Sequence, residues 1–213
     1  QIVASTIDAD LLDYLRRDAY FAGLRQDYDD RIFSTFTLVD NQLAIDLSRL
    51  STRTEILHLL RLRYFLTERV YYHHAKVSSG AMIAKAVELA VEKGLVESDI
   101  YPLTDDTLIH HLLTYKDARI DRLIHGFTNR KLLKRAYMIT TANVGRRGRD
   151  EFIATYNRSV DARQKIEREI ADAVTLSPDQ IILYCPDISS IKEASVNIYT
   201  PKGLSQLNAP PDN

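Results

Sequence analysis

Residues 7–18 read IDADLLDYLRRD, and this stretch decides which fold we expect. Apolar side chains recur at helical spacing from Ala9 to Ala22, which predicts an α-helix. Asp8 is placed to cap it, because a carboxylate can accept a hydrogen bond from an N–H group of the first turn. Gly23 is placed to end it, because glycine readily adopts the left-handed conformation that closes many helices.

One face of this helix carries four polar side chains. At about 100° per residue they share an arc of about 100°, and they are Asp10, Tyr14, Arg17 and Asp18. The opposite side carries Leu12, Leu15 and Ala19. A solvated face with ion pairs three and four residues apart is the ordinary interpretation of such a pattern. The alternative is that two carboxylates, a phenol and a guanidinium line a binding site.

A second polar stripe lies in residues 63–77, which read RYFLTERVYYHHAKV. Four side chains recur at i, i+4, i+8 and i+11, and they are Arg63, Thr67, Tyr71 and His74. Taken alone, Arg63 would be one half of a surface ion pair and Tyr71 a half-buried core aromatic. The stripe gains interest because it accompanies the polar face of the first helix.

The remaining pattern predicts a mainly α-helical chain, because only 7 Gly and 6 Pro interrupt it. The longest helix is expected over residues 52–94, with a capping box formed by Thr52 and Glu55 and a break near residues 78–80. Shorter helices are expected at residues 30–39, 105–115, 118–125, 129–138 and 161–174. Strands are expected at residues 181–184 and 195–199, and an extended or 3₁₀ segment at 43–47.

These elements predict a helical core, a linker and a small α+β appendage. The expected divisions are residues 1–139 for the core, 140–150 for a loop or linker, 151–207 for the appendage and 208–213 for a frayed tail. Residues 140–150 read TTANVGRRGRD and have no apolar period. We favour a solvated linker there over a loop in which Arg146, Arg147 and Arg149 touch phosphate.

The composition is that of a globular protein, with 45% hydrophobic and 27% charged residues over 213 positions. Lys and Arg total 28 against 29 Asp and Glu, so the net charge of -1 gives no global attraction for a polyanion. The single cysteine, Cys185, excludes an internal disulfide, and no second thiol accompanies the six histidines. No apolar run reaches the roughly 20 residues that span a bilayer, so we expect a soluble protein without a membrane partner. The lone cysteine makes a reducing, cytoplasmic setting the expected one.

Residues 7–23 and 63–77 together resemble the HD-domain deoxynucleoside triphosphate triphosphohydrolases, a group of metal-dependent phosphohydrolases. The first stretch is similar to the family's DADRLDYLLRDA segment, and the second to its R...LY..VY.HK..V helix. Residues 28–31, 129–135 and 192–194 are similar to further family segments, so the resemblance covers nearly the whole chain. It implies the C-terminal part of an HD-domain helical core.

The resemblance implies roles for five residues. Asp10 matches the family's last metal-ligand carboxylate, a ligand type that hard cations such as Mg²⁺ prefer. Tyr14 and Asp18 match residues that contact the deoxyribose, and Tyr71 matches one that packs on the sugar where a 2′-hydroxyl would sit. Arg63 matches a residue that faces the substrate phosphates, for which the guanidinium fork is suited.

The sequence departs from the family in its metal ligands. The family holds a divalent metal (Mg, Mn or Fe) with an upstream His, an adjacent His-Asp pair and the late Asp, but this sequence has no His-Asp dipeptide. We therefore expect the other ligands upstream of Gln1 or on a separate polypeptide, or else a degenerate relative. Leu11 and Thr67 stand where some family members have a phosphate-facing Lys and a His, which leaves substrate choice open.

The implied function is hydrolysis of a deoxynucleoside triphosphate to deoxynucleoside and tripolyphosphate by a homo-oligomer. Arg31 and His73 are candidate effector or phosphate contacts, by resemblance to nucleotide-activated relatives. The pairs His73–His74 and His110–His111 are expected to be ordinary residues, because neighbours on a helix point about 100° apart. Two alternatives stay open: a non-catalytic nucleotide-binding or assembly subunit, and an HD phosphohydrolase acting on another phosphoester. Nucleic-acid binding is not favoured.

Overall fold

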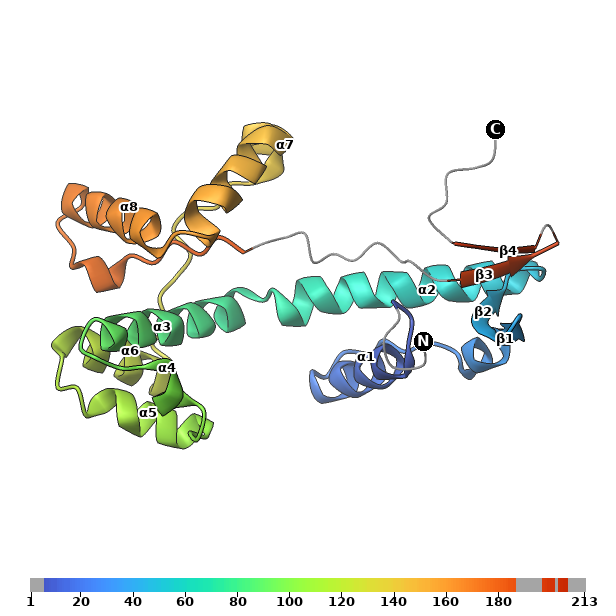
Figure 1. Cartoon of the computed structure of the whole chain (residues 1–213), viewed down its shortest axis with the longest axis horizontal. Helices are drawn as coiled ribbons and strands as arrows, with labels where there is room; N and C mark the ends of the chain where they lie inside the picture. Colours follow the sequence, from blue (N-terminus) through green and yellow to red (C-terminus); the bar gives the residue numbers. More distant parts are fainter. Residues whose placement is uncertain (1–5, 187–196, 202, 207–213) are drawn as a thin grey trace. The chain divides into compact units, whose positions relative to one another are not determined.

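A computed structural model describes residues 6–186, 197–201 and 203–206 of the chain (Figure 1). Most of these residues are helical, and four short strands form one sheet. The mainly helical fold expected from the sequence is therefore confirmed. No helix among these residues is long and apolar enough to cross a bilayer.

The chain forms two compact units. Unit 1 comprises residues 1–72 and 188–213, and unit 2 comprises residues 73–187. This division differs from the sequence-based one, because the boundary falls inside the long helix predicted for residues 52–94. Each unit has its own hydrophobic core.

Unit 1 begins with α1 (Ala9–Phe21), which packs against α2 (Leu50–Leu66) and lies alongside it in Figure 1. A 3₁₀ turn, η1 (Asp30–Thr35), precedes α2, and a π-helical turn, η2 (Thr67–Tyr71), follows it. The core between the helices is aliphatic, with Leu15, Leu59 and Leu66 fully buried. Each buried leucine contributes about 1.5–3 kcal/mol, so apolar packing fixes α1 on α2.

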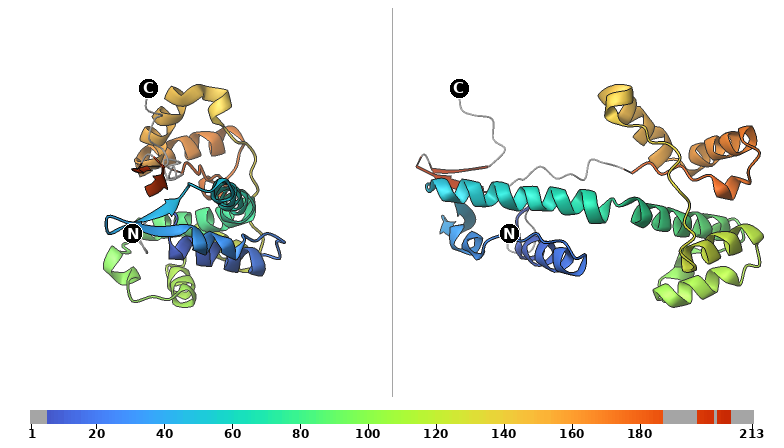
Figure 2. Two further views of the ribbon diagram at one scale, coloured as in Figure 1. Left: turned by 90° about the vertical axis from the view of Figure 1, so that its right-hand side faces the viewer. Right: turned by 180° about the vertical axis from the view of Figure 1, so that it is seen from behind.

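Four strands complete unit 1, and they are β1 (Phe36–Val39), β2 (Gln42–Asp46), β3 (Asn197–Thr200) and β4 (Gly203–Gln206). They bond in the order β1-β2-β3-β4, with a parallel β2–β3 pair between two antiparallel pairs. Figure 2 shows the blue and red strands of this sheet from two further sides. Asp40 and Asn41 join β1 to β2 with left-handed φ angles of 49° and 60°, which a tight two-residue hairpin requires. The helix predicted for residues 30–39 therefore gives way to a strand in its second half.

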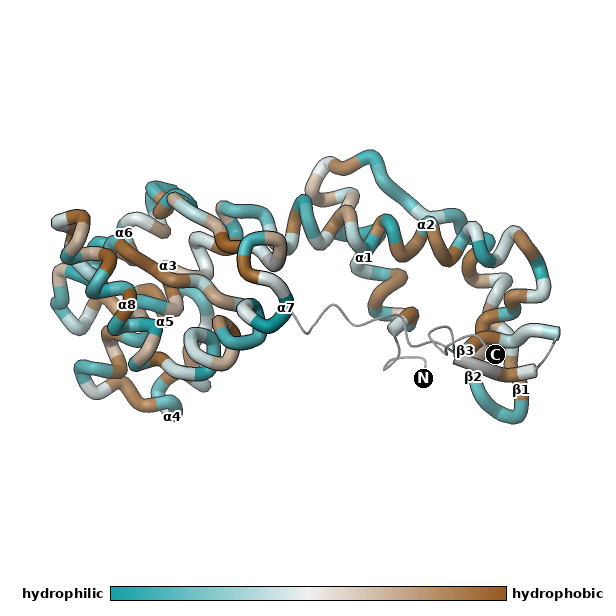
Figure 3. Tube along the Cα trace, turned by 90° about the horizontal axis from the view of Figure 1, so that it is seen from above, coloured by the Kyte–Doolittle hydropathy of each residue, from teal (hydrophilic) through white to brown (hydrophobic). Residues whose placement is uncertain are grey.

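Unit 2 is helical. Its helices are α3 (His74–Val91), α4 (Glu97–Ile100), α5 (Asp105–Leu113), α6 (Ala118–Thr128), α7 (Thr141–Phe152) and α8 (Val160–Ala173), with turns η3 (Ile153–Asn157) and η4 (Pro178–Gln180). α3 and α6 run side by side, and both carry brown, hydrophobic stretches in Figure 3. Their contact is the centre of the second core, which includes Met82, Leu89, Leu112, Ile120 and Ile124.

An ion-pair network joins α8 to α3. Lys85 Nζ lies 2.5 Å from Glu167 Oε2, and the two side chains are 7% and 1% exposed. The other Glu167 oxygen accepts a hydrogen bond from Leu183 N at 2.9 Å. Glu88 accepts a hydrogen bond from Arg163, and its second oxygen lies 3.8 Å from Lys85 Nζ. Four charges therefore compensate one another where little water can reach them.

Two predictions for the long helix were wrong, namely its capping box and the position of its break. α2 begins at Leu50 with Arg49 as its N-cap, and Thr52 is buried in its first turn, so the predicted capping box does not form. The helical path is interrupted at residues 72–73 rather than near residues 78–80, because His73 caps a new helix and accepts a hydrogen bond from Ala75 N. Residues 78–80 lie within α3.

The predictions of a helix at residues 129–138 and a loop at residues 140–150 were also wrong. Residues 131–140 form no regular element, whereas the predicted loop at 140–150 is mostly α7. Leu133 gives the physical reason, because its carbonyl accepts from Ser78 Oγ and its N–H points to Met82 Sδ. Tertiary bonds to α3 thus replace the backbone bonds of a local helix.

The C-terminal strands differ from expectation as well. Residues 181–184 are not a strand, and Leu183 N bonds to a side chain instead of a neighbouring strand. Of the strand expected at 195–199, residues 197–199 lie in β3, while residues 195–196 and the family-like segment 192–194 fall outside the described residues. β3 pairs with β2 of unit 1, so it does not form one lobe with α8.

Asp117, the N-cap of α6, makes unit 2 sensitive to acid. Its carboxylate accepts from Arg119 N at 2.9 Å and from the Arg119 guanidinium at 2.8 Å, and Lys93 Nζ lies 3.4 Å away. The Arg119 guanidinium, its backbone N–H and Lys93 together hold the pKa of this carboxyl well below its usual range. Because the pKa of Asp117 is lower in the folded protein than in the unfolded chain, its ionised carboxylate stabilises the fold at pH values above the ordinary pKa of 3.8. This stabilisation is lost as the pH falls below that value.

We therefore expect the free energy of unfolding to fall below about pH 4, and Asp117→Asn to remove part of that pH dependence. Urea unfolding at a series of pH values measures it. Asp121→Asn is the control, because Asp121 lies in the same helix and makes no side-chain bond within the described residues. Identical pH profiles for Asp117→Asn and the unaltered chain would contradict the assignment.

Candidate functional site

The first helix presents its polar face beside the end of α2. Asp8 accepts a hydrogen bond from Leu11 N at 2.8 Å, and Gly23 follows the helix with a φ of 69°, as predicted. Leu15 and Ala19 are fully buried. This burial sets the rotation of α1, and the same rotation turns residues 14 and 18 toward η2.

Three of the five residues singled out by the sequence meet here. Tyr71 donates its hydroxyl hydrogen to Asp18 Oδ2 at 2.7 Å. The rings of Tyr14 and Tyr71 lie edge to face, with centroids 6.0 Å apart and an interplanar angle of 74°. All three side chains are half-buried. An aromatic pair and a carboxylate oxygen therefore lie together at a partly open surface.

Tyr71 reaches Asp18 from a widened helical turn. Tyr72 N donates to Thr67 O at 2.8 Å, five residues back, which is the pattern of a π-helix. The extra residue per turn changes the direction in which Tyr71 points. The stripe predicted from Arg63 to His74 therefore ends at Tyr71, and His74 belongs to α3 of the other unit.

Both tyrosines are held in the protonated form. Burial, and then the hydrogen bond to Asp18, raises the pKa of Tyr71 well above its ordinary value of 10.0. Burial also raises the pKa of Tyr14; Arg63 opposes this rise, whereas Asp10 adds to it. At neutral pH each hydroxyl is therefore a hydrogen-bond donor, and neither is a base.

Arg63 and Asp10 are charged residues close enough to Tyr14 to influence its pKa. Arg63 is half-buried and Asp10 is exposed, and neither forms an ion pair within the described residues. Their charges are nevertheless felt at Tyr14, as its pKa shift shows. A guanidinium and a carboxylate near Tyr14 thus remain available to a ligand.

Arg17 shares this face and restrains Asp18. Its guanidinium pairs with Asp13, one turn earlier on α1, and its Nε lies 3.5 Å from Asp18 Oδ1. Asp18 is thereby held by Arg17 through one oxygen and by Tyr71 through the other. This arrangement fixes the carboxylate before any ligand arrives.

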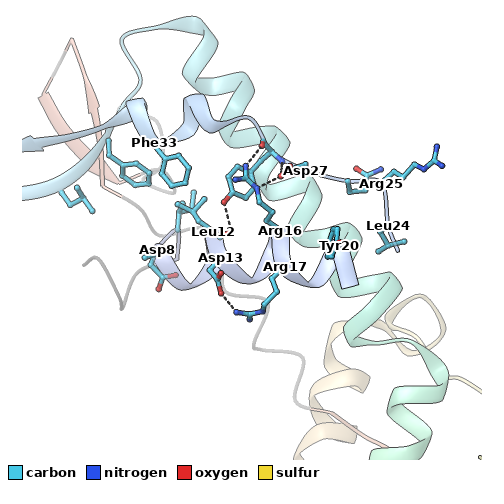
Figure 4. Close-up of a pocket in the computed structure, with 16 residues that line it drawn as sticks. Asp8, Leu12, Asp13, Arg16, Arg17, Tyr20, Leu24, Arg25, Asp27 and Phe33 are labelled. Carbon is cyan, nitrogen blue, oxygen red and sulfur yellow. Dashed lines mark hydrogen bonds and ion pairs between the residues drawn. The ribbon is translucent and has the colours of Figure 1, made fainter. Parts of the chain in front are cut away.

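A large open cavity lies on a different side of α1. Its volume is about 980 Å³, and its lining includes Leu12, Arg16 and Tyr20 but none of the five residues predicted for the site. Figure 4 shows these side chains on the near side of α1, with α2 behind it. The polar face with Asp18 and the cavity are therefore neighbouring surfaces of the same helix, and Arg17 borders both.

Arg16 organises the cavity wall, and the sequence analysis missed it. Its Nε donates to Asp27 at 2.8 Å, as a dashed line marks in Figure 4. Its Nη2 donates to Asp30 at 2.8 Å, and its guanidinium lies over the Tyr28 ring at 4.4 Å. Tyr28 in turn donates to Leu12 O at 2.7 Å. The acidic run at residues 27–30 could have predicted this role of Arg16. Three aspartates around one tyrosine indicate that a basic side chain lies nearby to balance their charge.

A comparison with protein families identifies the family to which this sequence is similar. The family model of the HD-associated region matches residues 27–210. The chain belongs to the HD-associated family. Arg63 and Tyr71 lie within the matched region, whereas Asp10, Tyr14 and Asp18 precede it.

Similar proteins agree with this membership. The HD-associated chain is 27% identical over 139 residues to the deoxynucleoside triphosphate triphosphohydrolase SAMHD1 homolog of Dictyostelium discoideum, a match that covers 61% of this chain and 26% of that protein. The chain thus spans about a quarter of the length of this curated relative.

Two solved structures share the fold. One is a phosphohydrolase from Bacteroides thetaiotaomicron, with a TM-score of 0.59, 19% identity, and coverage of 97% of this chain and 56% of that chain. The other is a hypothetical protein from Aquifex aeolicus, with a TM-score of 0.58, 17% identity, and coverage of 96% and 50%. The HD-associated chain corresponds to about half of each.

The described residues of the HD-associated chain do not make up a complete metal site. Asp10 is exposed and can offer one anionic oxygen, but the described residues contain no cluster of three or more His, Cys, Asp or Glu side chains. The pairs His73–His74 and His110–His111 form no such cluster either. A divalent ion at Asp10 would need ligands from elsewhere.

Two positions that differ from the resembled family have structural roles. Leu11 is 3% exposed and packs in the core of unit 1, so it does not face a ligand. Thr67 donates its hydroxyl hydrogen to Arg63 O at 2.8 Å, within the same helical segment. Leu11 therefore offers no polar group at the site, and the hydroxyl hydrogen of Thr67 is already used.

The two candidate effector contacts belong to different units. Arg31 is exposed and its guanidinium is paired with Asp29 at 3.0 Å in unit 1. His73 is exposed in unit 2, where its ring lies 4.2 Å from that of His74. Their assignment to an effector stays a prediction.

Proposed function

We propose that this HD-associated chain supplies part of the active site of a metal-dependent phosphohydrolase that converts a deoxynucleoside triphosphate to deoxynucleoside and tripolyphosphate. The bond between Tyr71 and Asp18, joined by the ring of Tyr14, supports this most directly. The deoxyribose of such a nucleotide offers its 3′-hydroxyl to a carboxylate oxygen and a carbon face to an aromatic ring, so these residues suit it. The similarity to the Dictyostelium triphosphohydrolase points to the same substrate class.

Each residue has one task in this proposal. Asp18 accepts a hydrogen bond from a sugar hydroxyl, and Tyr71 fills the space where a ribonucleotide carries its 2′-hydroxyl. Tyr14 forms a wall against the sugar. The half-buried Arg63 binds phosphate oxygens through its fork of donors. Asp10 gives one oxygen to a divalent metal ion (Mg, Mn or Fe) whose other ligands come from outside the described residues.

Product analysis of the complete encoded protein tests the proposal. The protein is incubated with each deoxynucleoside triphosphate and the matching ribonucleotide, with Mg²⁺, Mn²⁺ or Fe²⁺, and products are separated by ion exchange. We expect deoxynucleoside and tripolyphosphate in equal amounts, from a protein that sediments as a homo-oligomer. Metal-loaded protein that releases neither product sinks the proposal, and tight binding of the nucleotide without turnover would favour the non-catalytic alternative. Release of orthophosphate alone would mean that the terminal phosphoanhydride is cut instead of the bond between the nucleoside and the triphosphate.

Sugar discrimination is expected to depend on Tyr71. Tyr71→Ala opens the space beside Asp18, so the ratio of kcat/KM for deoxy- over ribonucleotide should fall about 10- to 100-fold. Tyr71→Phe keeps the ring and loses only the hydrogen bond, so it should retain most of the ratio. Tyr72→Ala is the control, because Tyr72 is adjacent and 42% exposed. An unchanged ratio in Tyr71→Ala would remove Tyr71 from the sugar site.

A further inference from the structure

The face of α1 that carries the proposed sugar contacts ends in an exposed aromatic residue. Phe21 is the last residue of α1 and is 79% exposed. At about 100° per residue, its side chain leaves the helix within about 20° of the direction of Tyr14 and about 60° from that of Asp18. The cavity on the neighbouring surface is lined by Tyr20 and not by Phe21 (Figure 4). Phe21 therefore belongs to the face of Tyr14 and Asp18.

The ring of Phe21 is oriented by a neighbour and remains open to solvent. It lies edge to face with the ring of Tyr20, with centroids 5.3 Å apart and an interplanar angle of 84°. This is a favourable arrangement of two aromatic rings, so it restricts how the Phe21 ring turns. Ala22 and Gly23, which follow, are exposed and small. A molecule that covers the open ring removes apolar surface from water, which favours its binding.

The polar face of α1 has a direction. Arg63 and Asp10 both act on the pKa of Tyr14, so the charged groups suited to phosphate and metal gather near the start of the helix. Asp18 follows Tyr14 by one turn, and Phe21 follows Asp18 by almost one more. At about 1.5 Å per residue, Asp18 lies about 12 Å along the axis from Asp10, and Phe21 about 4.5 Å beyond Asp18. The face thus runs from charged groups, through a hydrogen-bond acceptor, to an apolar ring.

A nucleotide has its groups in the same order. Its phosphates leave the sugar on one side of the ring oxygen, and its base leaves on the other. With the sugar at Asp18 and the phosphates toward Arg63, the base extends beyond Asp18 toward the end of α1. Every base has a flat π face on which an aromatic side chain can stack. The open ring of Phe21 is the aromatic group that this face of α1 offers there.

We propose that Phe21 stacks on the base of the bound deoxynucleotide and makes the site favour purines over pyrimidines. The assignment rests on the proposed function, which places the sugar at Asp18 and the phosphates at Arg63. A phenyl ring has no hydrogen-bonding group, so it selects a base by the area of its flat face and not by the groups on its edge. A purine has two fused rings and covers more of Phe21 than the single ring of a pyrimidine does.

Binding of deoxynucleosides to the complete encoded protein tests the proposal without metal or turnover. Deoxyadenosine and deoxycytidine carry the sugar and the base but no phosphate, and isothermal titration calorimetry measures their Kd. Phe21→Ala should weaken deoxyadenosine binding about 5- to 100-fold and deoxycytidine binding less, so the ratio of the two affinities moves toward one. Phe21→Trp should retain both affinities. Phe21→Leu keeps apolar bulk without a ring and should lose nearly as much as Phe21→Ala.

Phe33→Ala is the matched control, because it makes the same substitution at another exposed phenylalanine of unit 1, which borders the cavity. It should leave both affinities unchanged, and circular dichroism checks that each variant is folded. The proposal is overturned if Phe21→Ala or Phe21→Leu binds deoxyadenosine as tightly as the unaltered protein, or if Phe33→Ala loses as much affinity as Phe21→Ala. It is also overturned if the unaltered protein does not bind deoxyadenosine, or if sedimentation shows that Phe21→Ala changes self-association while both affinities stay the same.

The outcomes separate this proposal from the proposed function. Weaker deoxyadenosine binding in Phe21→Ala, in a protein that releases no tripolyphosphate, would support the base contact and contradict the hydrolysis. Release of tripolyphosphate from all four deoxynucleotides by Phe21→Ala, with every kcat/KM equal to that of the unaltered protein, would support the hydrolysis and remove Phe21 from the site.

Discussion

Replacing Lys85 by methionine is expected to lower the free energy of unfolding by about 3–5 kcal/mol. Lys85 is 7% exposed and its partner Glu167 is 1% exposed, so the substitution leaves a carboxylate in a place that water hardly reaches. Methionine preserves most of the side-chain volume, so the loss reports the charge and not a cavity. Urea unfolding followed by circular dichroism measures the change as a shift in midpoint.

A matched control is available on α8. Lys165→Met makes the same substitution at an exposed position, where the expected change is within about 0.5 kcal/mol. The double variant Lys85→Met with Glu167→Leu should recover part of the loss, because no unpaired charge remains. Full recovery is not expected, because Leu183 N loses its acceptor. Equal midpoints for Lys85→Met and Lys165→Met would show that the buried pair is not a stabilising contact of unit 2.

Asp10→Asn is expected to lower metal-dependent turnover by the complete protein at least about 100-fold, because a neutral amide binds a hard cation far more weakly than a carboxylate does. Asp10 is exposed, so the substitution leaves the fold intact. The measurements are kcat/KM at fixed metal concentration and the metal content of the purified protein. Both should fall together.

Asp13→Asn is the control for that experiment. Asp13 lies on the same helix, pairs with Arg17, and borders the cavity and not the tyrosine pair. We expect its turnover to stay within about twofold of the original, since an exposed ion pair contributes little. Wild-type turnover in Asp10→Asn, or an equal loss in Asp13→Asn, would remove Asp10 from the chemistry.

The first helix could be predicted from sequence because every determinant is local. Asp8, the apolar period and Gly23 act within one segment, and each behaves in the structure as expected. The meeting of Tyr71 with Asp18 came from family resemblance, since spacing alone relates no residue of α1 to one of η2. The π-helical turn that aims Tyr71 is invisible to a period of 3.6 residues.

The errors lie where tertiary contacts override local preference. Residues 131–140 have helix-forming side chains, yet Leu133 gives its backbone groups to α3. Residues 197–199 alternate as a strand should, but nothing near them identifies β2 as their partner. Arg16 was missed because its acidic partners lie on the segment after the helix. In these three places, contacts between residues far apart in the sequence determined the structure, and local secondary-structure propensity did not.

The central position of β2 has a consequence for synthesis of the protein. Its parallel neighbour, β3, is encoded after the whole of unit 2, so unit 1 is discontinuous in the chain. At about 5–20 residues per second, the roughly 150 residues between the two strands take about 8–30 s to translate. During that interval the β1–β2 hairpin leaves the ribosome with one edge open to other nascent chains, and unit 2 has time to fold before unit 1 can close.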